Sequence, residues 1–398
     1  MAKPKRNSRD RRDVRRKRQR RAGSEQTALP ALATLTELPE FCDLVPSNRQ
    51  VEAFETYKAD VERREGDASE LALGCVVRLD RGYPAVLTED QVFRAEFAAQ
   101  LTKSEFSRAA VGDWVAVRRP HAHDMGLIER ILPRESDIAR WKGGSRGEFQ
   151  TLAANVDVVL VVQALEEWRL TANRVARTAV VAQDCGAQVA VVLTKADNAE
   201  PEVISSAVHL VRDVLGDEVP VCVVASLDGV DHTDELAAAA CDAGGLWGIE
   251  SVRGLVSHGR VGMMLGPSGA GKSTLLNALL GREALQTGSV RESDGVGRHT
   301  TVARRMVAIP EAGTIVDEPG LRTLQMVGHE RGLAQVFPDI ADAASGCRFR
   351  NCTHTHEPGC EVIARFGSSD DSVRLKTYLA LANEMRESAE TLDPDVVI

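Results

Sequence analysis

The order of two motifs constrains this 398-residue chain more than any other feature. Residues Gly266–Ser273 read Gly-Pro-Ser-Gly-Ala-Gly-Lys-Ser, which matches a phosphate-binding P-loop. Residues Thr194–Asp197 read Thr-Lys-Ala-Asp, which looks like a guanine-reading segment. In most nucleotide-binding domains that carry both segments the P-loop comes first, whereas here it follows about seventy residues later. If both segments are functional, the domain that carries them is circularly permuted.

The P-loop sequence has the residue types that phosphate binding needs. The apolar run Val261–Leu265 predicts a buried strand before it, and Ser273–Leu280 predicts a helix after it. Small residues let backbone N–H groups converge on phosphate oxygens, and the helix N-terminus adds positive potential. Lys272 is expected to reach the β- and γ-phosphates, and the Ser273 hydroxyl to ligate Mg²⁺. The predicted phosphate-binding residues are Gly266, Pro267, Ser268, Gly269, Ala270, Gly271, Lys272, Ser273 and Thr274.

The Thr-Lys-Ala-Asp segment has the chemistry to distinguish guanine from adenine. Guanine presents two donors, N1–H and the N2 amino group, and the Asp197 carboxylate offers two acceptors. Lys195 can lay its aliphatic stem along the base. Thr194 stands where many guanine readers have Asn. Ser226 follows the apolar run Val219–Ala225 and is expected in the last base-contacting loop.

Two further segments are predicted to surround the γ-phosphate. Asp317 follows the apolar run Thr314–Val316 and begins Asp-Glu-Pro-Gly, so it is placed to hold Mg²⁺. The N–H of Gly320 could contact the γ-phosphate, although Asp-x-Pro-Gly is also a common turn. Upstream, Gly297–Thr301 reads Gly-Arg-His-Thr-Thr, and a Thr there can give Mg²⁺ a second hydroxyl ligand. The residues alone do not choose between Thr300 and Thr301.

The pattern around these motifs predicts an α/β domain over residues 150–332. Apolar strand-length runs alternate with helix-like stretches, which indicates a parallel sheet covered by helices. Ligands of such sheets bind at the carboxyl ends of the strands, where all of these motifs lie. The remaining predicted strands are Val156–Val162 and Gln188–Leu193, and the predicted helices are Leu170–Asp184 and Ile204–Leu215.

Upstream of that domain the sequence predicts a small β-barrel of OB type over residues 71–133. Five short β-like runs separated by Gly, Pro or polar residues are typical of that fold. Pro133-Arg134 then marks the exit into a Gly-, Ser- and Arg-rich linker, Arg140–Gly147. Residues 23–70 are a linker or extension with a helix around Gln50–Arg64. The predicted barrel strands are Leu73–Leu79, Tyr83–Leu87, Val92–Phe97, Asp113–Val117 and Gly126–Ile131.

Charge divides the chain into a basic tail and an acidic body. Residues 1–21 carry twelve Lys/Arg and two Asp, a net charge of +10, which leaves −19 for the rest. Such a tail, expected to be disordered, points to a polyanionic partner such as RNA, the alternative being a solvated tail that aids solubility. No apolar run approaches the roughly 18 residues of a membrane span, and no secretory signal follows the tail. A reducing, cytoplasmic location fits the cysteine usage.

Three cysteines and a histidine cluster near the C-terminus. Cys347, Cys352, His354 and Cys360 offer three thiolates and an imidazole within fourteen residues. Four ligands leave no open position, so the set predicts one structural Zn²⁺ without catalysis. His356 could replace His354, and free cysteines are the alternative. The stretch Asp371–Glu387 is helix-like, so residues 333–398 are predicted to form a small, α-helical zinc-binding domain.

In their order these motifs resemble the RsgA family, also called YjeQ or YloQ, of circularly permuted ribosome-assembly GTPases. The resemblance covers roughly residues 71–385, and the motif order together with the Cys/His cluster makes it specific. Besides the nucleotide and zinc motifs, it is carried by Val111-Gly112-Asp113-Trp114-Val115, Ile131-Leu132-Pro133-Arg134 and Ala154-Asn155-Val156-Asp157.

The resemblance implies an OB-fold, a permuted GTPase domain and a zinc-binding domain. Separately, the chain is expected to be a monomer. The resemblance also implies GTP hydrolysis to GDP and phosphate, stimulated by the small ribosomal subunit, and a role in late maturation of that subunit and contact with its rRNA. Leu321 stands where many GTPases have a catalytic Gln, so intrinsic hydrolysis should be slow, and His299 is the nearby candidate for a catalytic role alongside Lys272. Glu318 departs from the Thr usual in the family, which puts the turnover rate in doubt.

Two other functional hypotheses are compatible with the same residues. One is a non-hydrolysing RNA-binding protein gated by guanine nucleotides, which Glu318 and Leu321 keep in view. The other is an ATP-dependent P-loop enzyme. For the leading reading, we hypothesise that the permutation couples nucleotide state to the zinc-binding domain, because Asp317–Leu321 leads into that domain within about thirty residues.

Overall fold

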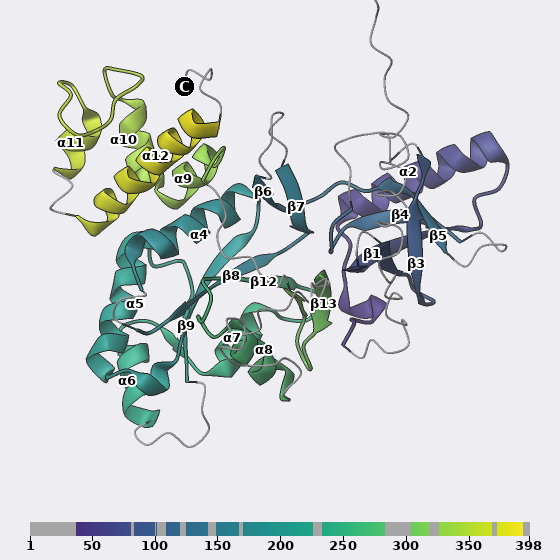
Figure 1. Cartoon of the computed structure of the whole chain (residues 1–398), viewed down its shortest axis with the longest axis horizontal. Coiled ribbons are helices and arrows are strands. Elements are labelled where there is room, and N and C mark those ends of the chain that lie inside the picture. Colours follow the sequence, from purple (N-terminus) through teal and green to yellow (C-terminus); the bar gives the residue numbers. More distant parts are fainter. Residues whose placement is uncertain are drawn as a thin grey trace, which may run out of the picture. The chain divides into compact units, whose positions relative to one another are not determined.

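A computed structural model gives the fold of the chain (Figure 1). It describes residues 37–80, 83–99, 101, 109–119, 125–141, 149–166, 170–225, 233–282, 304–317, 326–367 and 372–392. The predicted basic tail lies outside these residues. In the described part, no helix is long and apolar enough to cross a membrane.

The five predicted strands form a closed barrel of OB type. In the sheet they lie in the order β1, β2, β3, β5, β4, and β4 pairs again with β1 to close the barrel. The pair β3–β5 is parallel, and the other pairs of the barrel are antiparallel. Val76, Val86 and Ile128 fill its interior. The strands are β1 (Leu71–Asp80), β2 (Tyr83–Leu87), β3 (Val92–Phe97), β4 (Trp114–Arg118) and β5 (Gly126–Ile131).

Helix α2 (Asn48–Glu65) precedes the barrel and confirms the predicted helix. It begins with a capping box in which the Ser47 side chain accepts from the Gln50 N–H and the Gln50 side chain accepts from the Ser47 N–H. It ends at Gly66, whose φ of 82° is the left-handed conformation that glycine tolerates best. A short 3₁₀ turn at Phe41–Asp43 lies before it, with Phe41 edge-on to Trp114.

The stretch after the barrel differs from the predicted linker. Strands β6 (Asp137–Trp141) and β7 (Phe149–Ala154) pair antiparallel as a two-stranded sheet of their own. This pairing was not predicted from the sequence, because the Gly and Ser residues that follow Trp141 are typical of an irregular linker. Arg140 and Trp141 are therefore strand residues rather than linker.

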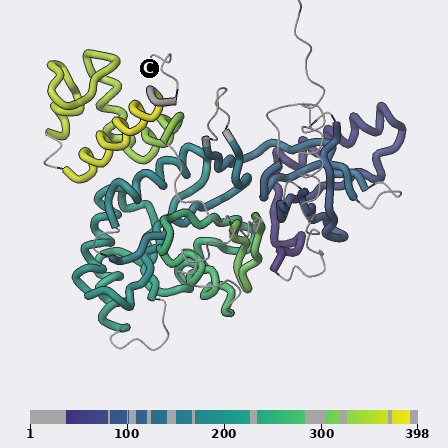
Figure 2. The backbone as a smooth tube through the Cα atoms, viewed as in Figure 1, coloured from purple at the N-terminus to yellow at the C-terminus, as the bar shows by residue number. Residues whose placement is uncertain are grey.

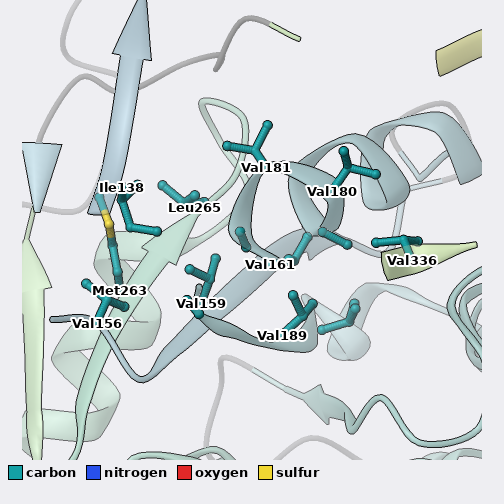
Figure 3. Close-up of a cluster of buried hydrophobic side chains, with 14 of the residues drawn as sticks. Ile138, Val156, Val159, Val161, Val180, Val181, Val189, Met263, Leu265 and Val336 are labelled. Carbon is teal, nitrogen blue, oxygen red and sulfur yellow. The ribbon is translucent and has the colours of Figure 1, made fainter. Parts of the chain in front are cut away.

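The α/β domain is built on a parallel sheet, as the apolar runs predict. Its parallel strands lie in the order β11, β10, β9, β8, β12, β14, and β13 joins antiparallel to β14. Residues Val159, Val161, Val180, Val181 and Val189 meet in its core (Figure 3). The strands are β8 (Val158–Ala164), β9 (Gln188–Thr194), β10 (Val221–Val224), β11 (Leu246–Trp247), β12 (Val261–Leu265), β13 (Arg304–Ala308) and β14 (Thr314–Asp317).

Helices connect these strands and continue beyond them, as the backbone trace shows (Figure 2). The sequence did not predict α6, α7 or the three short helices after β14. The long C-terminal helix is confirmed at α12. The helices are α4 (Ala172–Asp184), α5 (Pro201–Leu215), α6 (Thr233–Asp242), α7 (Ile249–Leu255), α8 (Lys272–Leu280), α9 (Glu330–Val336), α10 (Pro338–Ser345), α11 (Glu361–Phe366) and α12 (Val373–Leu392).

A single hydrogen-bonded sheet links the barrel to the α/β domain. Strand β13 pairs with β1, with Arg305 opposite Arg78 and Arg304 opposite Leu79. Within the part of the chain that the structure describes, the sheet therefore runs through twelve strands, from β11 to β4. The edge of the α/β sheet that β13 forms is covered by the barrel.

Candidate functional site: a nucleotide cradle and a Cys/His cluster

The P-loop connects β12 to α8, and its close contacts depend on glycine. A Cβ on Gly266 would lie 2.2 Å from the Val162 carbonyl oxygen, so no larger residue fits where the loop leaves the sheet. Gly269 and Gly271 have φ values of 78° and 84°. Gly271 is also the N-cap of α8. The loop is thus held in a backbone conformation that side chains would prevent.

The Lys272 ammonium lies over this loop and is bonded to it. Nζ donates to the carbonyl oxygens of Gly266 at 2.7 Å and Pro267 at 2.8 Å. Burial lowers the pKa of Lys272. Phosphate oxygens could take the place of these carbonyl oxygens, because they are stronger acceptors for an ammonium group. Ser268, Gly269 and Ser273 are exposed on the same loop.

Thr194 joins the base-reading segment to the P-loop directly. Its buried hydroxyl donates to the Ala270 carbonyl oxygen at 2.7 Å and lies 3.3 Å from the Gln163 carbonyl oxygen. A Cβ on Gly271 would lie 3.1 Å from the same hydroxyl. The two motifs that are reversed in sequence are therefore in contact in space.

Lys195 has an unusual backbone and a fixed side chain. Its φ of 61° is left-handed, and it caps the 3₁₀ turn Ala196–Asn198 that carries Asp197. Its Nζ lies 2.7 Å from Oε1 of Glu166, which follows β8. Sequence reasoning missed Glu166, because no motif spacing links it to Lys195. The ion pair orients the lysine stem at the carboxyl edge of the sheet.

Asp317 lies at the same edge, at the end of β14. Strand β12 pairs with β14 in parallel, with Met263 opposite Val316, so Asp317 follows at the level where β12 approaches the P-loop. Its Oδ2 is 3.7 Å from Nε of Arg305 on β13. The structure thus brings Asp317, the P-loop and the base-reading segment to one edge, as predicted.

Several predicted site residues lie outside the described residues. They belong to the last base-contacting loop and to the two segments predicted around the γ-phosphate. Their roles remain predictions. These residues are Ser226, His299, Thr300, Thr301, Glu318, Gly320 and Leu321.

The four predicted metal ligands come together in the C-terminal region. Their ligand atoms all lie within 4.8 Å of one another. Cys347 Sγ is 3.8 Å from Cys360 Sγ, and both sulfurs are 3.5 Å from Nδ1 of His354. A tetrahedral zinc ion with ordinary bond lengths needs separations of about 3.8 Å between sulfurs and about 3.5 Å from sulfur to nitrogen. The alternative ligand His356 instead has Nδ1 against the Thr355 hydroxyl.

Glu357 shapes the loop that presents His354. Its carboxylate accepts hydrogen bonds from the N–H groups of Thr353, Thr355 and His356, and from the Thr353 hydroxyl. These bonds hold the pKa of Glu357 far below its usual range. His354 has a φ of 57°, which this loop supports. The sequence offered no signal for this role.

A buried polar network joins the barrel to the amino edge of the α/β sheet. Arg134 makes a two-bonded ion pair with Asp113, whose side chain is fully buried, at 2.7 and 2.8 Å. Burial alone would lower the pKa of Arg134, but the hydrogen bonds and charge of Asp113 raise it well above its usual range. Arg134 also donates to Asp137 and to Thr151.

Asn155 is the centre of the same network. Its Oδ1 accepts from Gln50 Nε2 and from the Glu135 N–H, both at 2.9 Å, and its Nδ2 donates to the Gly112 carbonyl oxygen at 2.8 Å. A Cβ on Gly112 would lie 2.0 Å from the Ala154 carbonyl oxygen. The three motifs around Asp113, Arg134 and Asn155, separate in sequence, are therefore one joint.

A second contact ties the C-terminal helices to the same end of the domain. Asp184, the last residue of α4, accepts from Nδ1 of His329 at 2.8 Å and from the Gly332 N–H at 3.1 Å. A Cβ on Gly332 would lie 2.1 Å from the Val180 carbonyl oxygen. Burial would raise the pKa of Asp184, but the hydrogen bond and charge of His329 and the charge of Arg331 hold it below its usual value.

Together, the OB-type barrel, the parallel sheet with its P-loop after a base-reading segment, and the Cys/His cluster define a circularly permuted P-loop GTPase. The model of the family described as RsgA GTPase matches residues 131–239 and 225–327. The chain belongs to the RsgA family of GTPases.

Curated relatives extend the match over most of the chain. A protein of Streptomyces avermitilis named small ribosomal subunit biogenesis GTPase RsgA is 39% identical over 80% of this chain and 80% of its own. A protein of the same name from Leptospira interrogans is 32% identical over 81% and 84%. The structure of YjeQ from Thermotoga maritima matches with a TM-score of 0.55 at 20% identity, over 79% of this chain and 99% of that one. YloQ, described as a circularly permuted GTPase, matches with a TM-score of 0.54.

Proposed function

We propose that the protein hydrolyses GTP to GDP and phosphate while bound to the small ribosomal subunit, and acts in late maturation of that subunit. The main support for guanine-nucleotide binding is the hydrogen bond from the Thr194 hydroxyl to the Ala270 carbonyl oxygen. It holds the guanine-reading segment against the P-loop although their order in the chain is reversed. The ribosomal part is supported by the names of relatives that span about four fifths of the chain. The small subunit would place the protein in the cytoplasm.

We assign the parts of the nucleotide site as follows. Asp197 reads the guanine donors, Lys195 lies along the base, and Ser226 is proposed for the loop around the base. Lys272 and the backbone N–H groups of the P-loop bind the phosphates. Gly320 contacts the γ-phosphate, and His299 assists water attack, because Leu321 cannot orient water. The phosphate-binding set comprises Gly266, Pro267, Ser268, Gly269, Ala270, Gly271, Lys272, Ser273 and Thr274.

Mg²⁺ fits the oxygen donors at this edge. The Ser273 hydroxyl follows the P-loop lysine, and the Asp317 carboxylate ends the strand beside β12. One of Thr300 and Thr301 would add a hydroxyl. These are hard oxygen ligands of the kind that Mg²⁺ prefers. When bound, the ion would neutralise charge on the β- and γ-phosphates.

The Cys/His cluster is proposed to hold one structural Zn²⁺. Cys347, Cys352, His354 and Cys360 would be its ligands, and the separations of their ligand atoms fit a tetrahedral ion. Zinc would cross-link the loop between α10 and α11, which carries all four ligands. Metal analysis of the purified full chain should find about one zinc per chain, and a folded protein free of metal would contradict the assignment.

Turnover measurements with ribosomal subunits test the proposal. Phosphate release from GTP should be slow for the protein alone and rise on addition of small subunits but not of large subunits. ATP should not replace GTP, and Asp197→Asn should transfer the preference to xanthine nucleotides, because an amide offers one donor and one acceptor. GTP binding without stimulated turnover would support a non-hydrolysing RNA-binding switch instead.

The basic tail is proposed to contact rRNA. Deleting residues 1–21 should weaken subunit binding and flatten its dependence on salt, because fewer phosphates would be neutralised. An unchanged salt slope would leave the tail as a solubilising segment.

A further inference from the structure

Residues 37–47 precede the domains that the resemblance covers, yet Glu37 contacts the strand beside the proposed magnesium ligand. The Glu37 carbonyl oxygen accepts from the Ala308 N–H on β13 at 3.0 Å. Its side chain is only 11% exposed. The carboxylate lies 3.2 Å from a terminal nitrogen of Arg305 and 3.3 Å from one of Arg282. The Glu37 carboxylate is therefore paired with two guanidinium groups, of which Arg305 is 23% exposed and Arg282 is 56% exposed, so the pair with Arg305 is the less screened of the two.

Arg305 is shared between two carboxylates. Its Nη1 lies 3.2 Å from Oε2 of Glu37, an ion pair without a hydrogen bond, and its Nε lies 3.7 Å from Oδ2 of Asp317. Strands β13 and β14 fix this geometry, because Arg305 and Asp317 are opposite each other in the ladder. Both side chains are about one fifth exposed, so solvent screens their charges only in part. The charge balance at Asp317 therefore depends on Glu37 as well as on Arg305.

The charge of Arg305 works against a cation at Asp317. A guanidinium about 4 Å from a carboxylate competes with Mg²⁺ for it, because unit charges this close still interact strongly near a protein surface. A second carboxylate on the other side of the guanidinium cancels much of this field. The pairing of Glu37 with Arg305 should therefore favour metal binding by Asp317.

Glu37 also bridges the two ends of the chain segment that precedes β13. Arg282 follows α8, the helix that begins at the P-loop lysine, and Arg305 lies on β13. One carboxylate thus contacts the element after the P-loop and the strand next to Asp317. The backbone bond to Ala308 and the packing of Leu38 against the core hold this carboxylate in place independently of its charge.

We propose that Glu37 is a positioning residue for the nucleotide site, whose carboxylate neutralises Arg305 and so strengthens binding of Mg²⁺ by Asp317. The inference rests on the proposed function, since it takes Asp317 as a magnesium ligand. It assigns the segment before the barrel a part in setting the metal affinity of the GTPase domain.

The test is the Mg²⁺ dependence of GDP release, measured with a fluorescent GDP analogue on the full chain. Glu37→Gln should raise the Mg²⁺ concentration that half-maximally slows release by about tenfold, because Arg305 loses its counter-charge. Affinity for the analogue in EDTA should stay unchanged. Glu52→Gln removes the same charge from an exposed position of α2 and is the matched control, with no expected shift.

A second variant separates charge from structure. Arg305→Gln in the Glu37→Gln background removes the uncompensated cation and should return the half-effective Mg²⁺ concentration to within about twofold of wild type. Failure of this rescue would overturn the electrostatic role and leave Glu37 an anchor only. An unshifted Glu37→Gln variant, with Mg²⁺-dependent release intact in wild type, would overturn the inference alone. Release that is independent of Mg²⁺ in wild type would overturn the proposed metal site itself.

Discussion

The two edges of the parallel sheet carry polar side chains with opposite properties. At the carboxyl edge, the Lys272 ammonium is bonded to carbonyl oxygens of its own loop, and Ser273 beside it is exposed. At the amino edge, Asp113 is fully buried and Asn155 makes hydrogen bonds through both ends of its amide. At the carboxyl edge, a ligand can replace the carbonyl oxygens that now accept hydrogen bonds from Lys272. At the amino edge, the hydrogen bonds of Asp113 and Asn155 are made to other groups of the protein.

This difference separates a ligand-binding motif from a structural one. In the sequence, Val111–Val115 and Ala154–Asp157 are as distinctive as the P-loop. In the structure they form a joint between barrel and α/β domain, where the polar atoms of Asp113 and Asn155 are hydrogen-bonded within the protein, beside a cavity that Gly112, Asn155 and Asp157 help to line. Family resemblance identifies both kinds of motif, but only burial and hydrogen-bond partners tell them apart.

The largest expected effect is at the amino edge. Arg134→Met leaves the Asp113 carboxylate buried without its partner, and should lower the free energy of unfolding by about 3–5 kcal/mol in urea titration. Arg140→Met removes an exposed arginine of the neighbouring hairpin and should change it by less than about 0.5 kcal/mol. Equal effects of the two substitutions would mean that the buried pair does not hold the joint.

At the carboxyl edge the effect should fall on ligand binding instead. Lys272→Ala removes the ammonium group that is proposed to bind the phosphates, and should weaken GTP and GDP affinity about a hundredfold, by equilibrium fluorescence. Its unfolding free energy without nucleotide should stay within about 0.5 kcal/mol of wild type, because burial of the charged lysine is itself unfavourable. Lys376→Ala on the exposed face of α12 is the control, and a large loss of stability in Lys272→Ala alone would erase the contrast.

A smaller, pH-dependent effect is expected at Asp184. In the folded state the pKa of Asp184 is below its usual value, which is about 3.9 in an unfolded chain. The charged Asp184 therefore stabilises the fold fully above that unfolded pKa, and this stabilisation is lost as pH falls through the folded pKa. Asp184→Asn should therefore destabilise the protein by about 1–2 kcal/mol at pH 7. The gap to wild type should close in acid, measured by unfolding at several pH values. A gap independent of pH would argue against a charge effect, and Asp213→Asn, on the exposed face of α5, should show no gap.

The smallest effect is expected at Glu166. Glu166→Gln breaks the ion pair with Lys195. Because both side chains of this pair are about one quarter exposed, solvent weakens it, and GTP affinity should fall only about two- to fivefold. The loss should shrink in high salt, where screening weakens the pair in wild type as well. A loss that is the same at all salt concentrations would point to a change of loop conformation.

Strand positions could be read from the sequence where apolar periodicity was strong. Val92–Phe97, Gly126–Ile131 and Val261–Leu265 were predicted to the residue. Strand β13 was missed because it begins with Arg304 and Arg305, whose charges hide its buried half. The hairpin β6–β7 was missed because its pairing is local and short.

The candidate site was predictable in its parts but not in its contacts. The rule that ligands bind at carboxyl ends of parallel strands brought Asp317 and the P-loop to one edge. No rule of spacing predicts that Thr194 bonds Ala270, or that Asp184 meets His329 across 145 positions of sequence. Such contacts follow from packing of whole elements, for instance the close approach of α9 to α4 that Gly332 allows.

The pairing of β13 with β1 has a consequence for how the chain can be cut. Without the barrel, β13 would present unpaired N–H and C=O groups at a sheet edge, and such edges recruit other chains. A fragment that starts after Leu132 should therefore self-associate, even though it contains every residue proposed to contact the nucleotide or its Mg²⁺. By pairing with β13, the barrel therefore protects the domain that follows it from aggregation through this sheet edge.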